Sequence, residues 1–174
     1  MDTTWKFVKP LKDKSSILLV EKEWGIKLPE IFIELVINYN SGVPENTAFN
    51  TEFSTGKSSG ELLNFNLDSK DNVLAEYKNI EDKLPPDIFP FAADPGGNYI
   101  CFDYRMNKEN PQIVFWNHEE RFIIEGDQIV NPDVENEFDL HIIEPVSNDL
   151  EGFLNKLYTI KNDEDNDFEG FELL

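Results

Sequence analysis

The sequence predicts one α+β domain, with helices in its N-terminal third, a mostly antiparallel central sheet and a further helix near its C-terminus. Two observations carry this prediction. In the first third and again after residue 147, apolar residues recur every three to four positions, the spacing of a helix buried on one face. In between, apolar residues form short aromatic and β-branched runs, whose connections are too short for helical crossovers.

The N-terminal third contains two predicted helices. The first has Ser15 or Ser16 as its N-cap and ends at Gly25, a residue that readily adopts the left-handed conformation. The second begins at Pro29, whose missing N–H costs nothing in a first helical turn, and ends at residues 40–42, Asn-Ser-Gly. Its core-facing side chains are Phe32, Leu35, Val36 and Tyr39.

The next segment is predicted to be less regular. Residues 43–60 are rich in Asn, Thr, Ser and Gly, which indicates a long connection with a strand around Phe49. A strand is predicted over residues 61–65. A short helix with Ser69 as its cap follows and ends at residues 84–86, Leu-Pro-Pro, because a residue before proline avoids the α region.

The centre of the chain is predicted to form the sheet. Residues 94–97, Asp-Pro-Gly-Gly, indicate a tight reversal, because proline presets φ and glycine allows a positive φ. The predicted strands are 89–93, 98–104, 113–117 and 122–125, with 128–131 and 140–143 as further edge strands.

The C-terminal part contains one more predicted helix and a tail. Ser147 or Asn148 is the expected cap of this helix. Its apolar face consists of Phe153, Leu154 and Leu157. We therefore expect a domain over residues 1–160 and an acidic tail over residues 161–174.

Composition excludes several classes of protein. The chain carries 35 acidic and 15 basic residues, a net charge of −20, which argues against nucleic-acid partners and anionic membrane surfaces. Cys101 is the single cysteine, so neither a disulfide framework nor a zinc site with several thiolates is possible. No apolar leader follows the N-terminus, and no apolar run reaches the roughly 20 residues of a membrane span. We expect a cytoplasmic protein that uses no metal or cofactor.

Two fragments resemble parts of enzyme motifs but lack a required residue. Residues 54–58, Ser-Thr-Gly-Lys-Ser, end like a phosphate-binding loop, yet Thr51 stands where its first glycine belongs. Cys101 lies within an apolar run and has no sequence sign of an activating base. Residues 54–58 are better explained as part of a loop, and Cys101 as a buried strand residue.

A third fragment leaves one enzyme hypothesis open. His118 and Glu119 begin like a zinc-protease helix, but Phe122 occupies the place of the second histidine. Asp103 closes the neighbouring predicted strand. An active site formed by Asp103, His118 and Glu119 is therefore the enzyme alternative, provided that the three side chains converge.

Four fragments occur in an order that resembles one protein family. Residues 23–32, Glu-Trp-Gly-Ile-Lys-Leu-Pro-Glu-Ile-Phe, lead into the helix that ends at residues 40–42. The other fragments are the turn within residues 91–103, the Trp-Asn-His-Glu end of residues 111–119, and residues 146–154, which end in Phe-Leu. Over residues 13–158 the chain resembles the SUKH superfamily, which includes the fungal Smi/Knr cell-wall regulators and many bacterial toxin-immunity proteins.

This resemblance implies a single SUKH-like domain without catalytic activity, in which the motif residues set packing and turns. Bacterial members are mostly cytoplasmic immunity proteins that neutralise toxins, and fungal members regulate cell-wall synthesis through protein partners. We expect a cognate toxin domain as partner, with a Smi/Knr-type adaptor as the alternative. The motif residues are Trp24, Gly25, Leu28, Pro29, Phe32, Gly42, Asp94, Gly96, Gly97, Asp103, Phe115, Trp116, His118, Glu119 and Phe153.

Three segments are candidate partner-binding surfaces. The first is the loop of residues 43–60, because recognition concentrates in loops carried by a rigid scaffold. The others are the rim at Glu119 and Glu120 and the tail with Asp163, Glu164, Asp165 and Asp167. Such carboxylates would be attracted to a basic nuclease-type cleft. Exposed edge strands also allow a weak homodimer beside the monomer.

Overall fold

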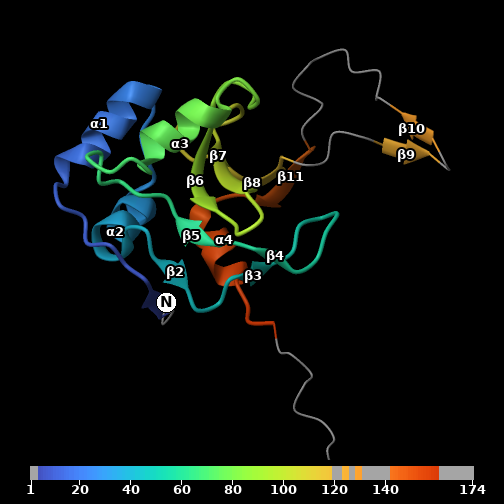
Figure 1. Cartoon of the computed structure of the whole chain (residues 1–174), viewed down its shortest axis with the longest axis horizontal. Helices are drawn as coiled ribbons and strands as arrows, with labels where there is room; N and C mark the ends of the chain where they lie inside the picture. The colour runs from blue at the N-terminus through green and yellow to red at the C-terminus, as the bar shows by residue number, and fades with distance from the viewer. Residues whose placement is uncertain (1–3, 119–122, 126–127, 131–141, 161–174) are drawn as a thin grey trace, which may run out of the picture.

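The computed structural model describes residues 4–118, 123–125, 128–130 and 142–160, and it confirms the α+β class (Figure 1). Its helices are α1 (Ser15–Trp24), α2 (Glu30–Tyr39), α3 (Val73–Ile80) and α4 (Leu150–Lys156). Its strands are β1 (Trp5–Lys6), β2 (Val43–Pro44), β3 (Ala48–Phe49), β4 (Lys57–Ser58), β5 (Glu61–Leu62), β6 (Ile88–Ala93), β7 (Tyr99–Asp103), β8 (Gln112–Asn117), β9 (Ile123–Glu125), β10 (Gln128–Val130) and β11 (Ile142–Ser147). No helix among the described residues is long and apolar enough to cross a membrane.

The starts of three helices differ from the expected ones: α3 and α4 begin at other side-chain caps, and α1 begins after Lys14, which makes no capping hydrogen bond. Asp13 accepts a hydrogen bond from the Ser15 amide at 2.8 Å, and Asp149 accepts one from the Gly152 amide at 2.7 Å. Asn72 accepts from two amides in the first turn of α3. The expected caps are wrong because an aspartate or asparagine oxygen reaches the free amides at each helix start. The caps that the sequence predicts are Ser15 or Ser16 for the first helix, Ser69 for the helix before residues 84–86, and Ser147 or Asn148 for the last helix.

The ends of the first two helices follow the sequence closely. Gly25 adopts a left-handed φ of 67° and ends α1, as its type predicts. Pro29 lies one residue before α2 rather than inside it, and its carbonyl accepts from the Phe32 amide at 2.9 Å. The proline therefore fixes the entry of the chain into the helix.

The central sheet is antiparallel throughout and has the strand order β11-β8-β7-β6-β5. Its last strand begins at Ile142, so the expected strand over 140–143 is replaced by a longer edge strand. Residues 128–130 do not join this sheet, because β10 pairs with β9 in a separate hairpin. The strand expected over 61–65 is limited to β5, which pairs with β6.

Both faces of the sheet are covered, which explains why its strands are apolar on consecutive positions. Ile100 and Phe102 of β7 belong to a core cluster shared with α1, α2 and α4. Cys101, between them, belongs to a second cluster that includes Ile80 at the end of α3 and Leu84. Successive side chains of a strand point to opposite faces, so one strand contributes to both clusters.

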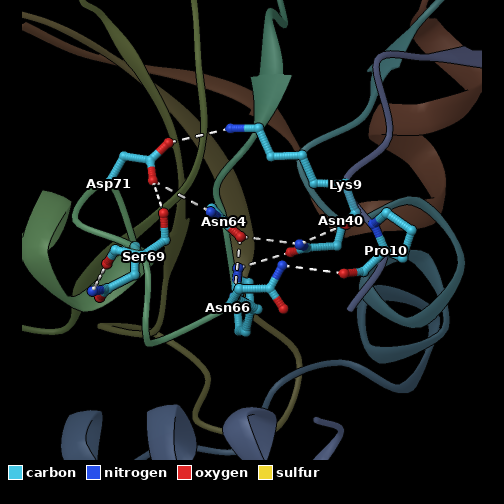
Figure 2. Close-up of polar contacts among 9 residues, drawn as sticks. Lys9, Pro10, Asn40, Asn64, Asn66, Ser69 and Asp71 are labelled. Carbon is cyan, nitrogen blue, oxygen red and sulfur yellow. Dashed lines mark hydrogen bonds and ion pairs between the residues drawn. The ribbon is translucent and has the colours of Figure 1, made fainter. Parts of the chain in front are cut away.

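A buried asparagine network ties the N-terminal arm to the core (Figure 2). The Asn40 side chain is fully buried just after α2. Its amide nitrogen donates to the Lys9 carbonyl at 2.9 Å and to Asn64 Oδ1 at 3.0 Å, and its oxygen accepts from the Phe65 amide at 2.7 Å. Asn40 thus does more than end a helix, because it satisfies three polar groups from two separate segments, one at Lys9 and the other at Asn64 and Phe65.

Two further contacts extend this network to the surface (Figure 2). Asn66 donates to the Pro10 carbonyl at 3.1 Å, and Lys9 Nζ lies 3.2 Å from Asp71 Oδ2. Hydrogen bonds from Ser69 and Lys9 lower the pKa of Asp71 to about 2. The arm of residues 9–12 is therefore fixed by side chains from the segment after β5.

Substitution of Asn40 tests this role. We expect Asn40→Ala to lower the free energy of unfolding by about 2–3 kcal/mol, because the buried Phe65 amide loses its acceptor. Asn38→Ala is the matched control, because Asn38 is exposed and, within the part of the chain that the structure describes, its side chain bonds only to the Glu34 carbonyl, at 2.8 Å. Urea unfolding of both variants measures the difference. Equal losses would contradict a central role for Asn40.

Candidate protein-binding site

The side chains of the enzyme hypothesis do not converge. Asp103 pairs with Gln112 at the beginning of β8, whereas His118 follows the other end of that strand. The six residue steps between these ends correspond to roughly 20 Å along the strand. The hypothesis is therefore wrong for Asp103 and His118, and Glu119 lies outside the described residues.

Asp103 and His118 each hold a local structure instead. Asp103 Oδ2 lies 2.7 Å from Arg105 Nη2, and its Oδ1 accepts from Arg105 Nε at 3.0 Å. His118 donates its amide to Asn98 Oδ1 at 3.2 Å, and its Nδ1 lies 2.9 Å from the same oxygen. The histidine thus joins the end of β8 to the turn before β7.

That turn is the predicted Asp-Pro-Gly-Gly reversal. The Asp94 amide donates to the Asn98 carbonyl at 2.9 Å, and the two Asp94 carboxylate oxygens accept from the amide and side chain of Asn98, both at 2.8 Å. Gly97 has a φ of 84°, and a Cβ there would lie 3.3 Å from His118 Cε1. The positive φ therefore favours glycine, and a Cβ here would also require the His118 ring to shift by a few tenths of an ångström.

The other enzyme-like fragments also have structural positions. Cys101 is fully buried, and burial, followed by the nearby Asp103 charge, raises the pKa of its thiol well above the usual value. Lys57 and Ser58, from the fragment that ends like a phosphate-binding loop, form β4 instead of starting a helix. Among the described residues, no group of three or more His, Cys, Asp or Glu side chains could hold a metal ion.

The loop expected over residues 43–60 is more ordered than the sequence predicts. It contains β2, which pairs with β1, and a hairpin of β3 and β4 in which Phe49 is opposite Lys57. The expected strand around Phe49 is thus one arm of a hairpin. Residues 50–56 connect the arms, and we call this segment the hairpin tip.

Hydrogen bonds fix the hairpin tip in one conformation. The Thr51 amide donates to the Ser54 carbonyl, and the Ser54 amide returns to Thr51 Oγ1, both at 2.8 Å. Asn50 Oδ1 accepts from the Gly56 amide at 2.9 Å and from the Tyr158 hydroxyl at 2.8 Å. The tip is therefore held internally and also from the chain that follows α4.

The buried carboxylate of Glu144 is hydrogen-bonded to the hairpin tip. Glu144 of β11 is only 2% exposed, and it accepts hydrogen bonds from the hydroxyls of Thr51 and Ser54. In the part of the chain that the structure describes, no lysine or arginine forms a salt bridge with Glu144. Because a buried carboxylate depends on its hydrogen bonds, its position is coupled to that of the tip.

The surface around the hairpin tip combines an aromatic side chain, carboxylates and a cleft. Phe53 is 72% exposed at the tip, next to the exposed Glu52. A cleft of about 580 Å³ lies beside it and is lined by Glu52, Gln112 and Asp149 among others. We call Glu52, Phe53 and this cleft the tip surface. An exposed aromatic on a preorganised loop is a typical anchor for a protein partner.

A family model described as SUKH_6, SMI1-KNR4 cell-wall, matches residues 14–154. The chain belongs to this family. The match covers most of the chain and confirms the family resemblance inferred from the motif order. No curated protein and no solved structure matches the chain.

In this SUKH chain, most motif residues occupy core or turn positions. Glu119 lies outside the described residues, as do the other proposed acidic contacts, which are Glu120, Asp163, Glu164, Asp165 and Asp167. The buried aromatic and aliphatic motif side chains are Trp24, Leu28, Phe32, Phe115, Trp116 and Phe153. The residues at helix ends and turns are Gly25, Pro29, Gly42, Asp94, Gly96 and Gly97.

The site of this SUKH domain also contains residues that the motifs do not mark. Phe53 is the only aromatic residue between Phe49 and Phe65, so its isolation in a polar loop was an available signal. Glu144 gave no such signal, since an acidic residue in a chain with 35 acids is expected at the surface. The pairing of β11 with β8 is what buries it.

Removal of the buried carboxylate should loosen the hairpin tip. We expect Glu144→Ala to speed amide hydrogen exchange at Thr51 and Ser54 about tenfold or more, because the tip loses two hydrogen bonds at its base. Glu151→Ala, at an exposed position of α4, is the control. Exchange in β7 should stay unchanged in both variants. Unaltered exchange at the tip in Glu144→Ala would contradict the coupling.

Proposed function

We propose that this chain is a non-enzymatic, cytoplasmic immunity protein of the SUKH family that captures a cognate toxin domain in a one-to-one complex. Family membership supports an immunity-type or Smi/Knr-like protein. The enzyme candidates that lie among the described residues have structural roles. Asp103 and His118 are far apart, and Cys101 is buried. Binding is therefore the activity that the site supports best.

The tip surface is the observation that carries this proposal. Its loop is held by hydrogen bonds from three sides, so a partner that binds there need not order it. Phe53 offers a large apolar contact area with few rotamers to lose, and the cleft beside it is lined by the charged residues Glu52, Asp149 and Lys156. The complementary partner surface has an apolar pocket bordered by lysines or arginines.

The net charge of −20 gives the capture an electrostatic form. A toxin that acts on nucleic acid has a basic cleft for phosphates, and a carboxylate-rich protein is steered toward such a cleft and occupies its phosphate sites. Association then slows as salt rises, because salt screens the attraction. If the affinity of the complex does not change with salt, the proposed capture of a toxin domain stands, but its electrostatic mechanism is wrong.

The proposal is tested by affinity purification of the tagged chain from its source, at low and at moderate salt, with identification of what remains bound. The expected result is one tight partner with a toxin-like domain, at a ratio of one to one. Recovery of several endogenous cell-wall or signalling proteins instead would contradict the immunity function.

Phe53 is expected to be an energetic centre of the complex. Phe53→Ala should raise the Kd for the purified partner at least tenfold, since truncation of a central aromatic anchor costs about 2 kcal/mol or more. Met106→Ala is the control, because Met106 is also an exposed apolar side chain, in the connection between β7 and β8. Titration calorimetry of both variants gives the comparison. Equal Kd values for the two variants would remove the hairpin tip as the contact.

A regulatory adaptor is the second candidate function. The description of the matching family as SMI1-KNR4 cell-wall favours it, since it points to proteins of cell-wall regulation. The same binding surface would then serve an endogenous partner. Deletion of the gene discriminates the two functions, because loss of an adaptor harms cells that meet no toxin, and loss of an immunity protein does not.

A further inference from the structure

One side of α1 carries a row of two lysines and a leucine. Lys14, Leu18 and Lys22 occur at intervals of four residues, so their side chains are neighbours along the helix. All three are exposed, and Leu18 is 63% exposed. Glu23, one residue later, is rotated by about 100° around the helix axis. Within the part of the chain that the structure describes, neither Lys14 nor Lys22 forms a salt bridge. The row therefore presents an apolar side chain between two positive charges.

A hollow of about 420 Å³ continues this row beyond its second lysine. Leu18 and Ile26 contribute apolar side chains to the hollow, and Lys22, Lys27 and Lys108 contribute positive charge. We call the row and the hollow together the lysine face. By contrast, the cleft beside the hairpin tip and another hollow, of about 300 Å³, are each lined by two acidic residues and one lysine.

The acidic groups beside the lysine face do not neutralise it. Glu21 also lines the hollow, but its side chain is only 6% exposed. Its carboxylate lies 2.9 Å from Lys27 Nζ and accepts from the Leu28 amide at 2.9 Å. Asp87 Oδ2 lies 2.6 Å from Lys108 Nζ. The four lysines of the face thus exceed these two carboxylates, which makes it a basic surface on a chain with a net charge of −20.

The sequence contains a segment whose composition complements this face. Residues 161–174 carry six acidic residues and one lysine, and they also contain the apolar residues Phe168, Phe171, Leu173 and Leu174. The segment lies outside the described residues. Its carboxylates match the lysines of the face, and its apolar side chains match the apolar part of the hollow. The lysine face therefore has an occupant of suitable chemistry within the same sequence.

We propose that the acidic tail of one copy of the chain, residues 161–174, binds the lysine face of another copy. In Figure 1, α1 and the end of the described segment after α4 lie on opposite sides of the fold, so the contact is made between copies and not within one. One copy supplies its tail and the other its helix, which makes the contact heterologous. Such a contact can repeat from copy to copy, so association continues beyond the dimer as concentration rises.

Salt acts on this contact in two opposite ways. Two molecules with a net charge of −20 repel each other at low salt. At about 0.15 M salt, charges more than roughly 8 Å apart are largely screened, whereas the close lysine–carboxylate contacts persist. At about 1 M salt these contacts weaken as well. Association is therefore strongest at intermediate salt. The inference does not depend on the proposed immunity function.

Sedimentation equilibrium of the full chain at about 0.15 M salt tests the contact. The weight-average mass should rise with concentration above the 20.2 kDa of the monomer, and it should return toward that value at about 1 M salt. Lys22→Glu should weaken the association several-fold. Lys70→Glu is the matched control, because it makes the same change of charge at another exposed lysine, and its effect should be much smaller. A constant monomer mass, or equal effects of the two variants, would overturn the proposal.

A mixture of two variants tests the head-to-tail arrangement. The face variant combines Leu18→Asp with Lys22→Glu, and the tail variant combines Phe168→Ser with Phe171→Ser. Each variant alone should remain a monomer. Their mixture should form dimers and nothing larger, because the face variant still offers a tail and the tail variant still offers a lysine face. Circular dichroism verifies that both variants fold. A mixture that stays monomeric, or a tail variant that associates like the wild type, would show that the tail is not the occupant.

Discussion

Gly60→Ala is expected to lower the free energy of unfolding by about 3–5 kcal/mol, or to prevent folding. Gly60 has a φ of 59° and immediately precedes β5. A Cβ at this position would lie 1.7 Å from the Ala93 carbonyl oxygen and 2.7 Å from Asp94 Cα. These atoms belong to the backbone at the end of β6, so relief of the clash requires β5 to move away from its partner strand.

Gly25→Ala is the matched control for this experiment. Gly25 has a similar φ of 67°, but apart from its chain neighbours no atom of the described residues lies within 4 Å of the position that its Cβ would occupy. It therefore isolates the cost of a left-handed alanine, about 1–2 kcal/mol. Urea unfolding of the two variants separates conformational strain from the clash. Losses of equal size would contradict the close approach of Gly60 to β6.

Phe32→Ala is expected to cost about 3–5 kcal/mol of unfolding free energy. The Phe32 ring is fully buried, and its centroid lies 5.0 Å from that of Phe102 and 5.4 Å from that of Phe91, both with edge-to-face geometry. Phe32 therefore joins α2 to two central strands, and truncation leaves a cavity between layers that cannot collapse without moving the helix.

The neighbouring residue provides the control. Ile31→Ala should cost less than about 1 kcal/mol, because Ile31 is 41% exposed on the same helix. Both variants lose a large apolar side chain from α2, so helix propensity alone does not separate them. Thermal and urea unfolding measure the contrast. A loss below 1 kcal/mol for Phe32→Ala would contradict its place at the centre of the core.

The elements with strong local signals were predictable from the sequence. The periodicity of α2, the stop at Gly25 and the turn at residues 94–97 depend on neighbouring residues, and the structure agrees with each. The helix caps were harder, because serine, aspartate and asparagine are similar as caps and the first helical residue decides among them. The fold class follows from the stronger signals.

Features that depend on strand pairing were not predictable in the same way. The opposite positions of Asp103 and His118 follow from the register of β7 and β8. The burial of Glu144 follows from the pairing of β11 with β8, and the role of Asn40 depends on segments 24 residues or more away in the chain. Composition therefore placed the candidate site in a loop, but the residues that hold this loop, such as Glu144, could be identified only from the fold.

Stoichiometric capture is the central claim, and titration of toxin activity tests it most directly. The toxin domain recovered with the chain is held at a fixed concentration, and its activity is measured as the chain is added. The claim predicts a linear fall to zero at one molar equivalent, independent of incubation time. Complete inactivation by a small fraction of an equivalent, progressing with time, would contradict it and require an enzymatic activity of the chain.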